Sequence, residues 1–211
     1  EQLLAKLQQE PEFAQQVAQQ LGLDTTDPNA IIEQVVQQIT GGGQFAVKDP
    51  ISWYNEGLKH ATTGNVEAAI EAWDKTIALQ PDFAEAWYNR GCALGQLKQP
   101  EEAIASYDKA VELKPDYIEA WFNRGTMLFQ VGRFEEAIAS YDQAIEINPD
   151  DASFWYHRAN ALNELERLQE ALDSYNKAIA VSDVFPAAAK QRDEVQAKLN
   201  RLNAESHNEQ E

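Results

Sequence analysis

The sequence predicts an all-α fold in which one helix-turn-helix unit is repeated and stacked. Tryptophans recur every 34 residues, and the segments that begin at them are alike: "WYNEGLKH", "WYNRGCAL", "WFNRGTML" and "WYHRANAL". The second and third units also share "EEAIASYD" at the same offset. A fixed period of this length is typical of repeat architectures, in which each unit buries its apolar face against its neighbours.

Other positions of the unit predict how its two helices pack. With each Trp at position 4, small residues recur at positions 8 and 20, where larger side chains would push the helices apart. They are Gly57, Gly91, Gly125 and Ala159 at position 8, and Ala69, Ala103, Ala137 and Ala171 at position 20. Aromatic residues at position 24, from Trp73 to Tyr175, fill the space between units. Proline at position 32, as at Pro115, ends the second helix because it lacks an amide hydrogen and clashes with the preceding turn.

These residue types and spacings closely resemble the tetratricopeptide repeat family, over roughly residues 50–183. The resemblance implies a right-handed superhelical solenoid of antiparallel helix pairs. Its units span residues 50–83, 84–117, 118–151 and 152–185. The fourth unit departs from the pattern at Ala159 and at Asp183, which replaces the proline. The repeat style also looks like arrays abundant in photosynthetic bacteria, where relatives assist photosystem assembly.

Residues 186–203 are predicted to form a C-terminal capping helix. The segment begins with proline, which suits a first helical turn, and it presents Ala189, Val195 and Leu199 or Leu202 at roughly helical spacing among charged residues. Such a helix covers the last repeat with a polar outer face. The remaining residues, 204–211, have nothing apolar to bury and are expected to form a mobile tail.

Residues 1–44 are rich in glutamine and lack Trp and Tyr, and they are predicted to form a separate helical extension. Apolar residues recur at helical intervals in three stretches. They are Leu3, Leu4 and Leu7, then Phe13, Val17 and Leu21, then Ile31, Ile32, Val35, Val36 and Ile39. Pro11 suits the start of the second helix, and Asp27 is a good N-cap for a third helix that begins at Pro28. The sequence "TGGGQ" at 40–44 predicts a flexible linker.

The apolar stripe of this third helix must be covered, and three explanations remain open. The extension caps the first repeat, or it pairs with the same segment of another copy and so forms a homodimer. Alternatively, it is a small module that binds hydrophobic partners. Capping or self-docking is the preferred interpretation.

Acidic and basic positions predict a ladder between successive units. The acids at position 25, Asp74, Asp108 and Asp142, are each followed in the next unit by an arginine at position 7, Arg90, Arg124 and Arg158. Arg192 extends the trend after Asn176. The hypothesis is that these pairs fix the stacking of the units. The alternative is that they are exposed pairs worth about 0.2–1 kcal/mol each.

The formal charge of the chain is 17 minus 35, or −18. An acidic chain without a basic cluster is repelled by phosphate backbones and anionic lipids, so neither nucleic acid nor membrane binding is expected. Cys92 is the only cysteine, which excludes an internal disulfide. We therefore expect a cytoplasmic protein, although an upstream signal or anchor could be missing because the sequence does not begin with Met.

No catalytic, metal or cofactor site is predicted. The three histidines are scattered, and none is joined by cysteines or acids at ligand spacing. The glycine-rich "TGGGQ" lacks the Lys and Ser or Thr of a phosphate-binding loop. Adjacent acids such as Glu101 and Glu102 recur at one place in the unit, which indicates a solvated helix face. The sequence does not predict an enzyme.

The family resemblance implies that the first helix of each unit lines a concave groove. The candidate peptide-binding residues of this groove are Tyr54, Asn55, Glu85, Tyr88, Asn89, Glu119, Phe122, Asn123, Phe129, Tyr156 and His157. They include a row of amides, continued by His157, and a row of aromatics. Carboxamides both donate and accept hydrogen bonds, so they can pair with the backbone of an extended peptide. Ala61, Cys92 and Gly95 are small and would leave room for a bulky side chain of a ligand. Tyr and Asn are, however, common at these positions of the family whatever the ligand.

The sequence thus predicts a non-catalytic scaffold or adaptor that binds another protein through an extended neutral or basic segment, with a role in complex assembly. The listed groove positions hold acids and no Lys or Arg, which disfavours the acidic tails of heat-shock chaperones. One alternative is a self-assembling structural module whose groove is filled by its own N-terminal helices or by another copy. A second alternative is the regulatory region of a longer enzyme.

Overall fold

The computed structural model describes residues 6, 10–22, 27–40, 48–182 and 185–208. They belong to two compact units that divide between Lys48 and Asp49, and each unit is described by itself. The expected helix around Leu3, Leu4 and Leu7 and the linker at 41–44 lie outside the described residues. So does Asp183. All regular structure in the described part of the chain is helical, which confirms the predicted all-α class.

The N-terminal unit contains α2 (Pro11–Leu21) and α3 (Pro28–Thr40). Asp27 caps α3 as expected, because its Oδ1 accepts the backbone N–H of Asn29 at 3.1 Å. The two helices pack through small and branched residues, among which Ala14 and Ile31 are fully buried. The apolar stripe of α3 is therefore covered, at least in part, by α2.

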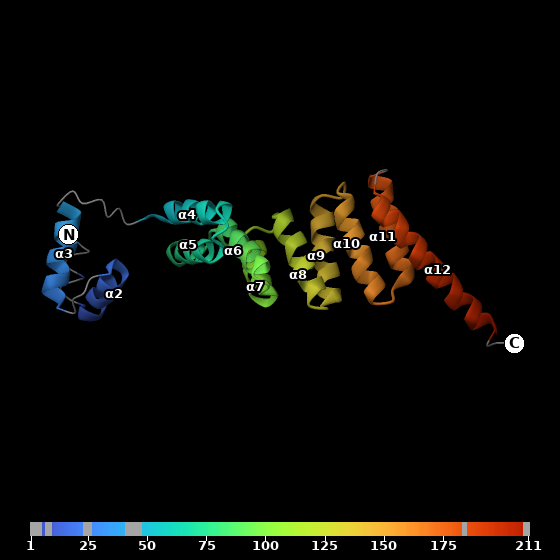
Figure 1. Ribbon diagram of the computed structural model, residues 1–211, viewed down its shortest axis with the longest axis horizontal. Coiled ribbons are helices and arrows are strands. Elements are labelled where there is room, and N and C mark those ends of the chain that lie inside the picture. Colours follow the sequence, from blue (N-terminus) through green and yellow to red (C-terminus); the bar gives the residue numbers. More distant parts are fainter. Residues whose placement is uncertain (1–5, 7–9, 23–26, 41–47, 183–184, 209–211) are drawn as a thin grey trace. The chain divides into compact units, whose positions relative to one another are not determined.

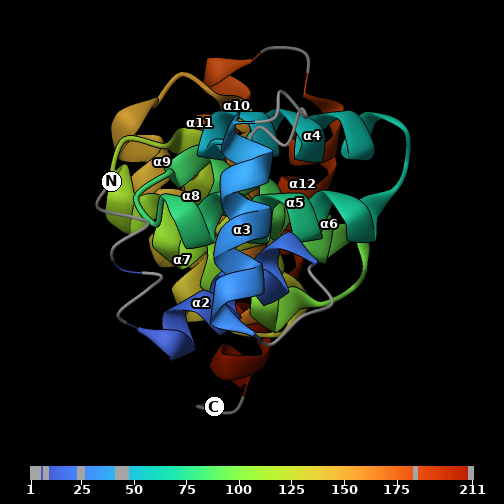
Figure 2. The same cartoon turned by 90° about the vertical axis from the view of Figure 1, so that its left-hand side faces the viewer.

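The second unit consists of helix pairs stacked one after another, followed by α12. The pairs are α4 (Pro50–Thr62) with α5 (Val66–Leu79), α6 (Ala84–Gln96) with α7 (Pro100–Leu113), α8 (Ile118–Gln130) with α9 (Phe134–Ile147), and α10 (Ala152–Glu164) with α11 (Leu168–Val181). The helices of each pair are antiparallel and follow one another in a single direction (Figure 1). Seen end on, the pairs overlap (Figure 2). We call each pair a repeat and number the repeats one to four.

The turn between the two helices of each repeat needs a residue with a left-handed backbone conformation, that is a positive φ, at position 15. Gly64 and Gly132 supply it in repeats one and three, with φ of 79° and 78°. Lys98 and Glu166 adopt the same conformation in repeats two and four, with φ of 58° and 57°. A non-glycine residue pays about 1 kcal/mol for this conformation, so the turn geometry is imposed by the packing of the two helices.

Glycine at position 8 allows the two helices of a repeat to approach, as predicted. A Cβ atom added to Gly125 would lie 2.6 Å from Cε1 of Tyr141, and one added to Gly91 would lie 2.7 Å from Cε1 of Tyr107. Both distances are far below van der Waals contact. The aromatic ring of the second helix thus packs directly on the backbone of the first.

A tryptophan forms a hydrogen bond to the loop that connects each repeat to the one before it. The helices α5, α7 and α9 end two residues before a proline, as expected from position 32. The indole Nε1 of Trp87, Trp121 and Trp155 donates to the carbonyl oxygen of Pro81, Pro115 and Pro149, respectively, at 2.9 Å in every case. The tryptophans that define the repeat in the sequence therefore hold the loop that precedes them.

The predicted arginine ladder is confirmed and has a second contact. Nε of Arg124 donates to Oδ1 of Asp108 in the repeat before at 2.6 Å, and a terminal nitrogen donates to Oγ of buried Ser140 at 2.6 Å. The equivalent distances are 2.7 and 2.7 Å at Arg90 and 2.6 and 2.6 Å at Arg158. Each arginine thus joins the second helices of two successive repeats.

The expected extension of this ladder to Arg192 is wrong. Its guanidinium pairs with the neighbouring Asp193, with Nη2 2.6 Å from Oδ1. Asn176 carries no charge to attract the guanidinium, so the adjacent carboxylate takes its place. The ladder ends at repeat four.

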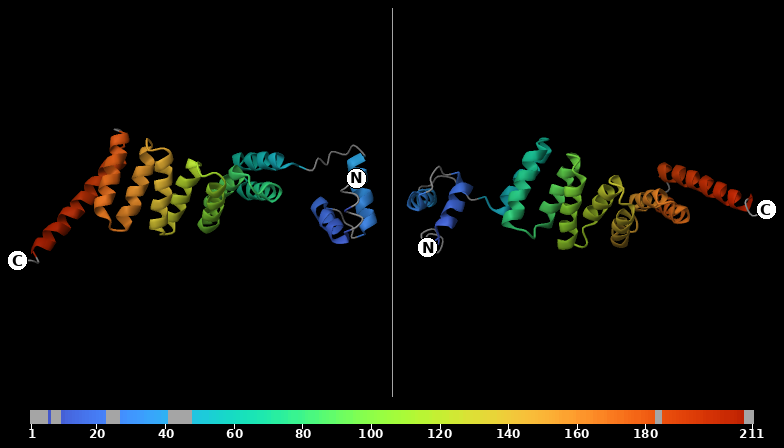
Figure 3. Two further views of the ribbon diagram at one scale, coloured as in Figure 1. Left: turned by 180° about the vertical axis from the view of Figure 1, so that it is seen from behind. Right: turned by 90° about the horizontal axis from the view of Figure 1, so that it is seen from below.

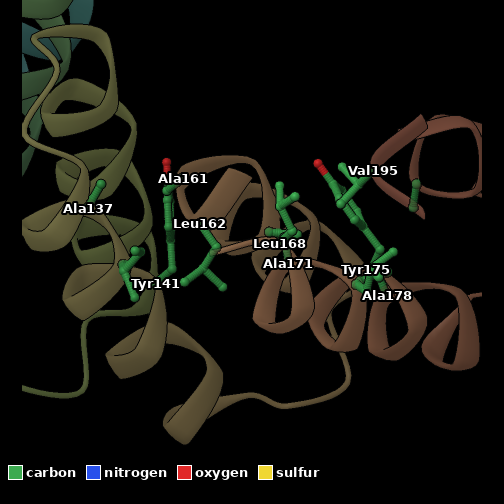
Figure 4. Close-up of a cluster of buried hydrophobic side chains, with 14 of the residues drawn as sticks. Ala137, Tyr141, Ala161, Leu162, Leu168, Ala171, Tyr175, Ala178 and Val195 are labelled. Carbon is green, nitrogen blue, oxygen red and sulfur yellow. The ribbon is translucent and has the colours of Figure 1, made fainter. Parts of the chain in front are cut away.

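The C-terminal helix α12 (Pro186–Asn208) covers repeat four. Its buried residues are Ala188 and Val195, which join a cluster that runs through α9, α10 and α11 (Figure 4). Beyond Leu199 the described side chains are exposed, and the helix continues past the expected end at 203 as far as Asn208. No Pro or Gly interrupts the segment, and adding residues to an existing helix costs little. Figure 3 shows α12 continuing the row beyond α11.

Candidate functional site

The candidate residues belong to the first helices of the repeats, which lie along one side of the stack. Helix α8 contacts both α6 and α10, whereas no second helices of neighbouring described repeats approach each other to the same extent. The first helices of repeats two, three and four are thus neighbours along one side of the stack. We call the surface formed by positions 2, 5, 6, 9, 12 and 13 of α4, α6, α8 and α10 the first-helix surface.

Aromatic residues at position 5 of this surface pack against aromatics at position 34. The ring centroids of Tyr54 and Phe83 are 4.8 Å apart, and those of Tyr88 and Tyr117 are also 4.8 Å apart. The predicted aromatic row is thus one half of a row of pairs. Phe83 and Tyr117 were not among the expected site residues, although the recurrence of an aromatic at position 34 in three of the four units was a usable signal.

The predicted amides hold the tyrosines of the preceding repeat. Nδ2 of Asn89 donates to the hydroxyl of Tyr54 at 2.9 Å, and Nδ2 of Asn123 donates to the hydroxyl of Tyr88 at 3.2 Å. One N–H of each amide is therefore used within the protein. Nδ2 of Asn123 also donates to Sγ of Cys92 at 3.7 Å. No described residue bonds to the two amide oxygens, so each amide keeps an acceptor for a ligand.

Asn55 differs from the other amides because repeat one has no tyrosine before it. It is exposed on α4, on the same polar patch as Ser52, Glu56 and Lys59. The residues at position 3 of later repeats, such as Ala86, are buried, and so are Ala93 and Ala161 at position 10. Repeat one carries Ser52 and Lys59 at these positions, so its outer face is polar.

At the junction of repeats three and four, an aromatic contact takes the place of the tyrosine–asparagine hydrogen bond found at the two earlier junctions. Phe122 has no hydroxyl, and it meets His157 edge to face with ring centroids 5.0 Å apart. Position 34 is Asp151, which caps α10 by accepting the backbone N–H of Ser153 at 2.8 Å. Phe154 supplies the missing ring, with its centroid 5.2 Å from that of Phe122. His157 therefore belongs to an aromatic cluster, and its Nδ1 lies 2.8 Å from the carbonyl oxygen of Ser153.

Three carboxylates contribute negative charge to the first-helix surface, namely Glu85, Glu119 and Glu164. Glu119 and Glu164 are exposed. Glu85 pairs with Nζ of Lys114 at 3.2 Å, so a lysine of the second helix region lies beside this surface although the listed groove positions hold none. Burial raises the pKa of the Tyr54 phenol, and the charge of Glu85 raises it further. Carboxylates and tyrosines thus lie close enough to influence one another.

The small residues of this surface have different surroundings. Ala61 and Cys92 line a pocket of about 180 Å³ between repeats one and two. Gly95 is covered, because a Cβ atom there would already contact Sδ of Met127 at 3.4 Å. Phe129 packs edge to face on Phe134, with centroids 5.3 Å apart. Of the three small residues, Ala61 and Cys92 therefore border open space, and Gly95 does not.

Within the described ranges, no three His, Cys, Asp or Glu side chains are grouped so that they could hold a metal ion. Among the helices of the same ranges, none has both the length and the apolar character needed to cross a bilayer.

A stack of helix pairs with one surface of recurring aromatics, amides and carboxylates defines the class of repeat scaffolds. Tetratricopeptide repeat profiles match residues 57–98 and 125–165, 84–117, 106–139 and 152–183, and together they run without a gap from 57 to 183. The chain belongs to the tetratricopeptide repeat family.

Solved structures share the fold at low sequence identity. A MamA fragment from Desulfovibrio magneticus RS-1 is 18% identical, with a TM-score of 0.67, and the match covers 76% of this chain and 92% of the fragment. YrrB, described as a tetratricopeptide repeat protein with an unusual peptide-binding site, is 20% identical, with a TM-score of 0.64 and coverage of 86% and 89%.

A third structure is the first such domain of Spaghetti (RPAP3), which was solved with the HSP90 peptide SRMEEVD. It is 24% identical, with a TM-score of 0.53, and the match covers 56% of this chain and 96% of the domain. A search of curated proteins gave no match. These comparisons do not support the expected likeness to arrays of photosynthetic bacteria.

Proposed function

We propose that this protein is a non-catalytic scaffold that holds an extended, neutral or basic segment of a partner protein on its first-helix surface. The observation that carries the proposal is the repetition of one set of groups along this surface. Asn89 and Asn123 each offer a free amide oxygen beside an aromatic pair, one repeat apart. Evenly spaced amides suit the backbone of an extended peptide.

The charge of the surface supports a neutral or basic ligand. Glu85, Glu119 and Glu164 lie along it, and Lys114 neutralises only the first of them. The whole chain has a formal charge of −18, so a basic segment is attracted and an acidic one repelled. The peptide SRMEEVD bound by the Spaghetti (RPAP3) domain is acidic at its end, and the proposal does not extend to such a ligand.

The test reverses the charge of the surface without disturbing the amide–tyrosine pairs. A double variant, Glu85→Lys with Glu119→Lys, changes position 2 of repeats two and three. A matched double variant, Glu101→Lys with Glu135→Lys, changes the same charge at position 18 of the same repeats, where both side chains are exposed on second helices. Partners are captured from the source cells by the intact chain, and their affinities are then measured with purified proteins.

We expect the first double variant to bind the partner at least about tenfold more weakly, which corresponds to about 1.4 kcal/mol. The matched variant should bind like the intact chain. Equal affinities for the two double variants would place the binding surface elsewhere and remove the proposal.

A further inference from the structure

The pocket between repeats one and two is built around Trp73. Leu58 and Ala61 of α4, Val66 of α5, and Cys92 and Gln96 of α6 also form part of its lining. None of the residues that line it is charged. We call this space of about 180 Å³ the first-junction pocket.

Trp73 carries a hydrogen-bond donor that the protein does not satisfy. Its side chain is 3% exposed, and its indole Nε1 is buried without a partner among the described residues. A buried N–H without an acceptor costs about 1–3 kcal/mol.

The other repeats show what is different here. At the same position, the hydroxyl of Tyr107 bonds to Sγ of Cys92 at 3.4 Å, and that of Tyr175 donates to Oδ1 of Asn160 at 2.6 Å. Position 9, which supplies these partners, is Leu58 in repeat one, and a leucine side chain accepts no hydrogen bond. In repeat one, Trp73 therefore stands in place of the tyrosine and Leu58 in place of its hydrogen-bond acceptor. The first-junction pocket lies beside these two residues.

We propose that the first-junction pocket takes one uncharged apolar side chain of the partner segment, of the size of phenylalanine or leucine, which packs beside Trp73. This inference rests on the proposed function, and it adds the residue type that the partner must present. An apolar cavity of about 150 Å³ is known to hold benzene, so the pocket has room for such a ring. A charged side chain is excluded, because nothing in the lining would pair with it.

The test uses the full chain and four probes, which are the N-acetyl amides of phenylalanine, leucine, glutamate and lysine. Binding is followed by the NMR signal of the Trp73 indole N–H, assigned by its loss in Trp73→Phe. The alkylation rate of Cys92, the only cysteine, gives a second readout at the same pocket. We expect the phenylalanine and leucine probes to shift the signal and slow the alkylation, and the charged probes to do neither.

Two variants close the pocket by copying other repeats. Ala61→Phe introduces the residue that repeat three carries at this position, and Ala61 is exposed, so the fold accommodates the change. Leu58→Asn copies repeat four and replaces an apolar side chain of the lining by a polar amide. Each should weaken binding of the phenylalanine probe at least about tenfold. Ala139→Phe, at an exposed site on α9, adds the same ring away from the pocket and should change nothing.

Some outcomes separate this inference from the proposed function. If neither apolar probe shifts the Trp73 signal, or if Ala61→Phe binds the probe and the partner as the intact chain does, the pocket has no such role. The proposed function then stands as long as the Glu85→Lys and Glu119→Lys double variant still releases the partner. If the pocket variants block the apolar probes but charge reversal has no effect on the partner, the pocket is supported and the surface is not.

Discussion

The arginine ladder gives the sharpest stability prediction, and Arg124 is its middle member. Replacement by methionine keeps most of the apolar stem and removes the guanidinium. The contact with Asp108 is worth about 0.5 kcal/mol, because that carboxylate is 49% exposed and screened by solvent. The contact with Ser140 is worth about 1.5 kcal/mol, because a charged donor meets a hydroxyl that is fully buried. We therefore expect Arg124→Met to cost about 2 kcal/mol.

Arg133→Met is the matched control. Arg133 also pairs with a carboxylate, that of Glu136 at 2.6 Å, but the pair lies within one helical turn and both side chains are nearly half exposed. Its loss should cost no more than about 0.5 kcal/mol. Urea and thermal unfolding followed by circular dichroism measure both variants. A cost of 2 kcal/mol corresponds to a fall in Tm of about 4–8 °C for an array of this size.

Double-mutant cycles separate the two contacts. The coupling energy of Arg124 with Ser140, from Ser140→Ala, should exceed that with Asp108, from Asp108→Asn. Small-angle scattering of Arg124→Met tests whether the ladder also sets the stacking of the repeats. If Arg124→Met is no more harmful than Arg133→Met, the buried contact has no energetic weight and the reasoning is wrong.

Two further predictions concern the aromatic residues. Burial raises the pKa of six of the seven tyrosines, in Tyr141 to about 12. Their stabilising contribution is therefore complete below the unfolded value of about 10 and is lost as the pH rises through the folded values. Absorbance of tyrosinate and circular dichroism should then change together in alkali. Separately, Phe122→Tyr and His157→Asn should each destabilise the junction of repeats three and four. The double variant recreates the tyrosine–asparagine pair of the two earlier junctions. Its stability, measured by urea unfolding, should exceed the value that the sum of the two single changes predicts.

Each of these two predictions would be contradicted by a specific result. Tyrosines that ionise near pH 10 while the helices stay intact would show that burial does not hold the phenols in their neutral form. Strictly additive effects at Phe122 and His157 would show that the two side chains do not act as a pair.

The sequence by itself determined the helix pairs, their order and the ladder. A period of 34 residues gives Gly125 and Arg124 the same surroundings as their counterparts in the other repeats. A residue type that the packing requires therefore recurs in the sequence at the same position of each repeat. The helix ends followed from the prolines for the same reason. The end of α12 was missed, because no residue near 203 stops a helix and only the extent of packing suggested a limit.

Only the tertiary structure decided what the candidate residues contact. Tyr54 and Asn89 stand 35 residues apart, and their hydrogen bond depends on how α4 and α6 are set against each other. The same packing covers Gly95 with Met127 and leaves Trp73 beside an open pocket without an acceptor. A repeat pattern shows which side chains share a position, but their neighbours across a junction depend on the rotation and spacing of the helices. Those quantities are set by the summed packing of all the side chains between them.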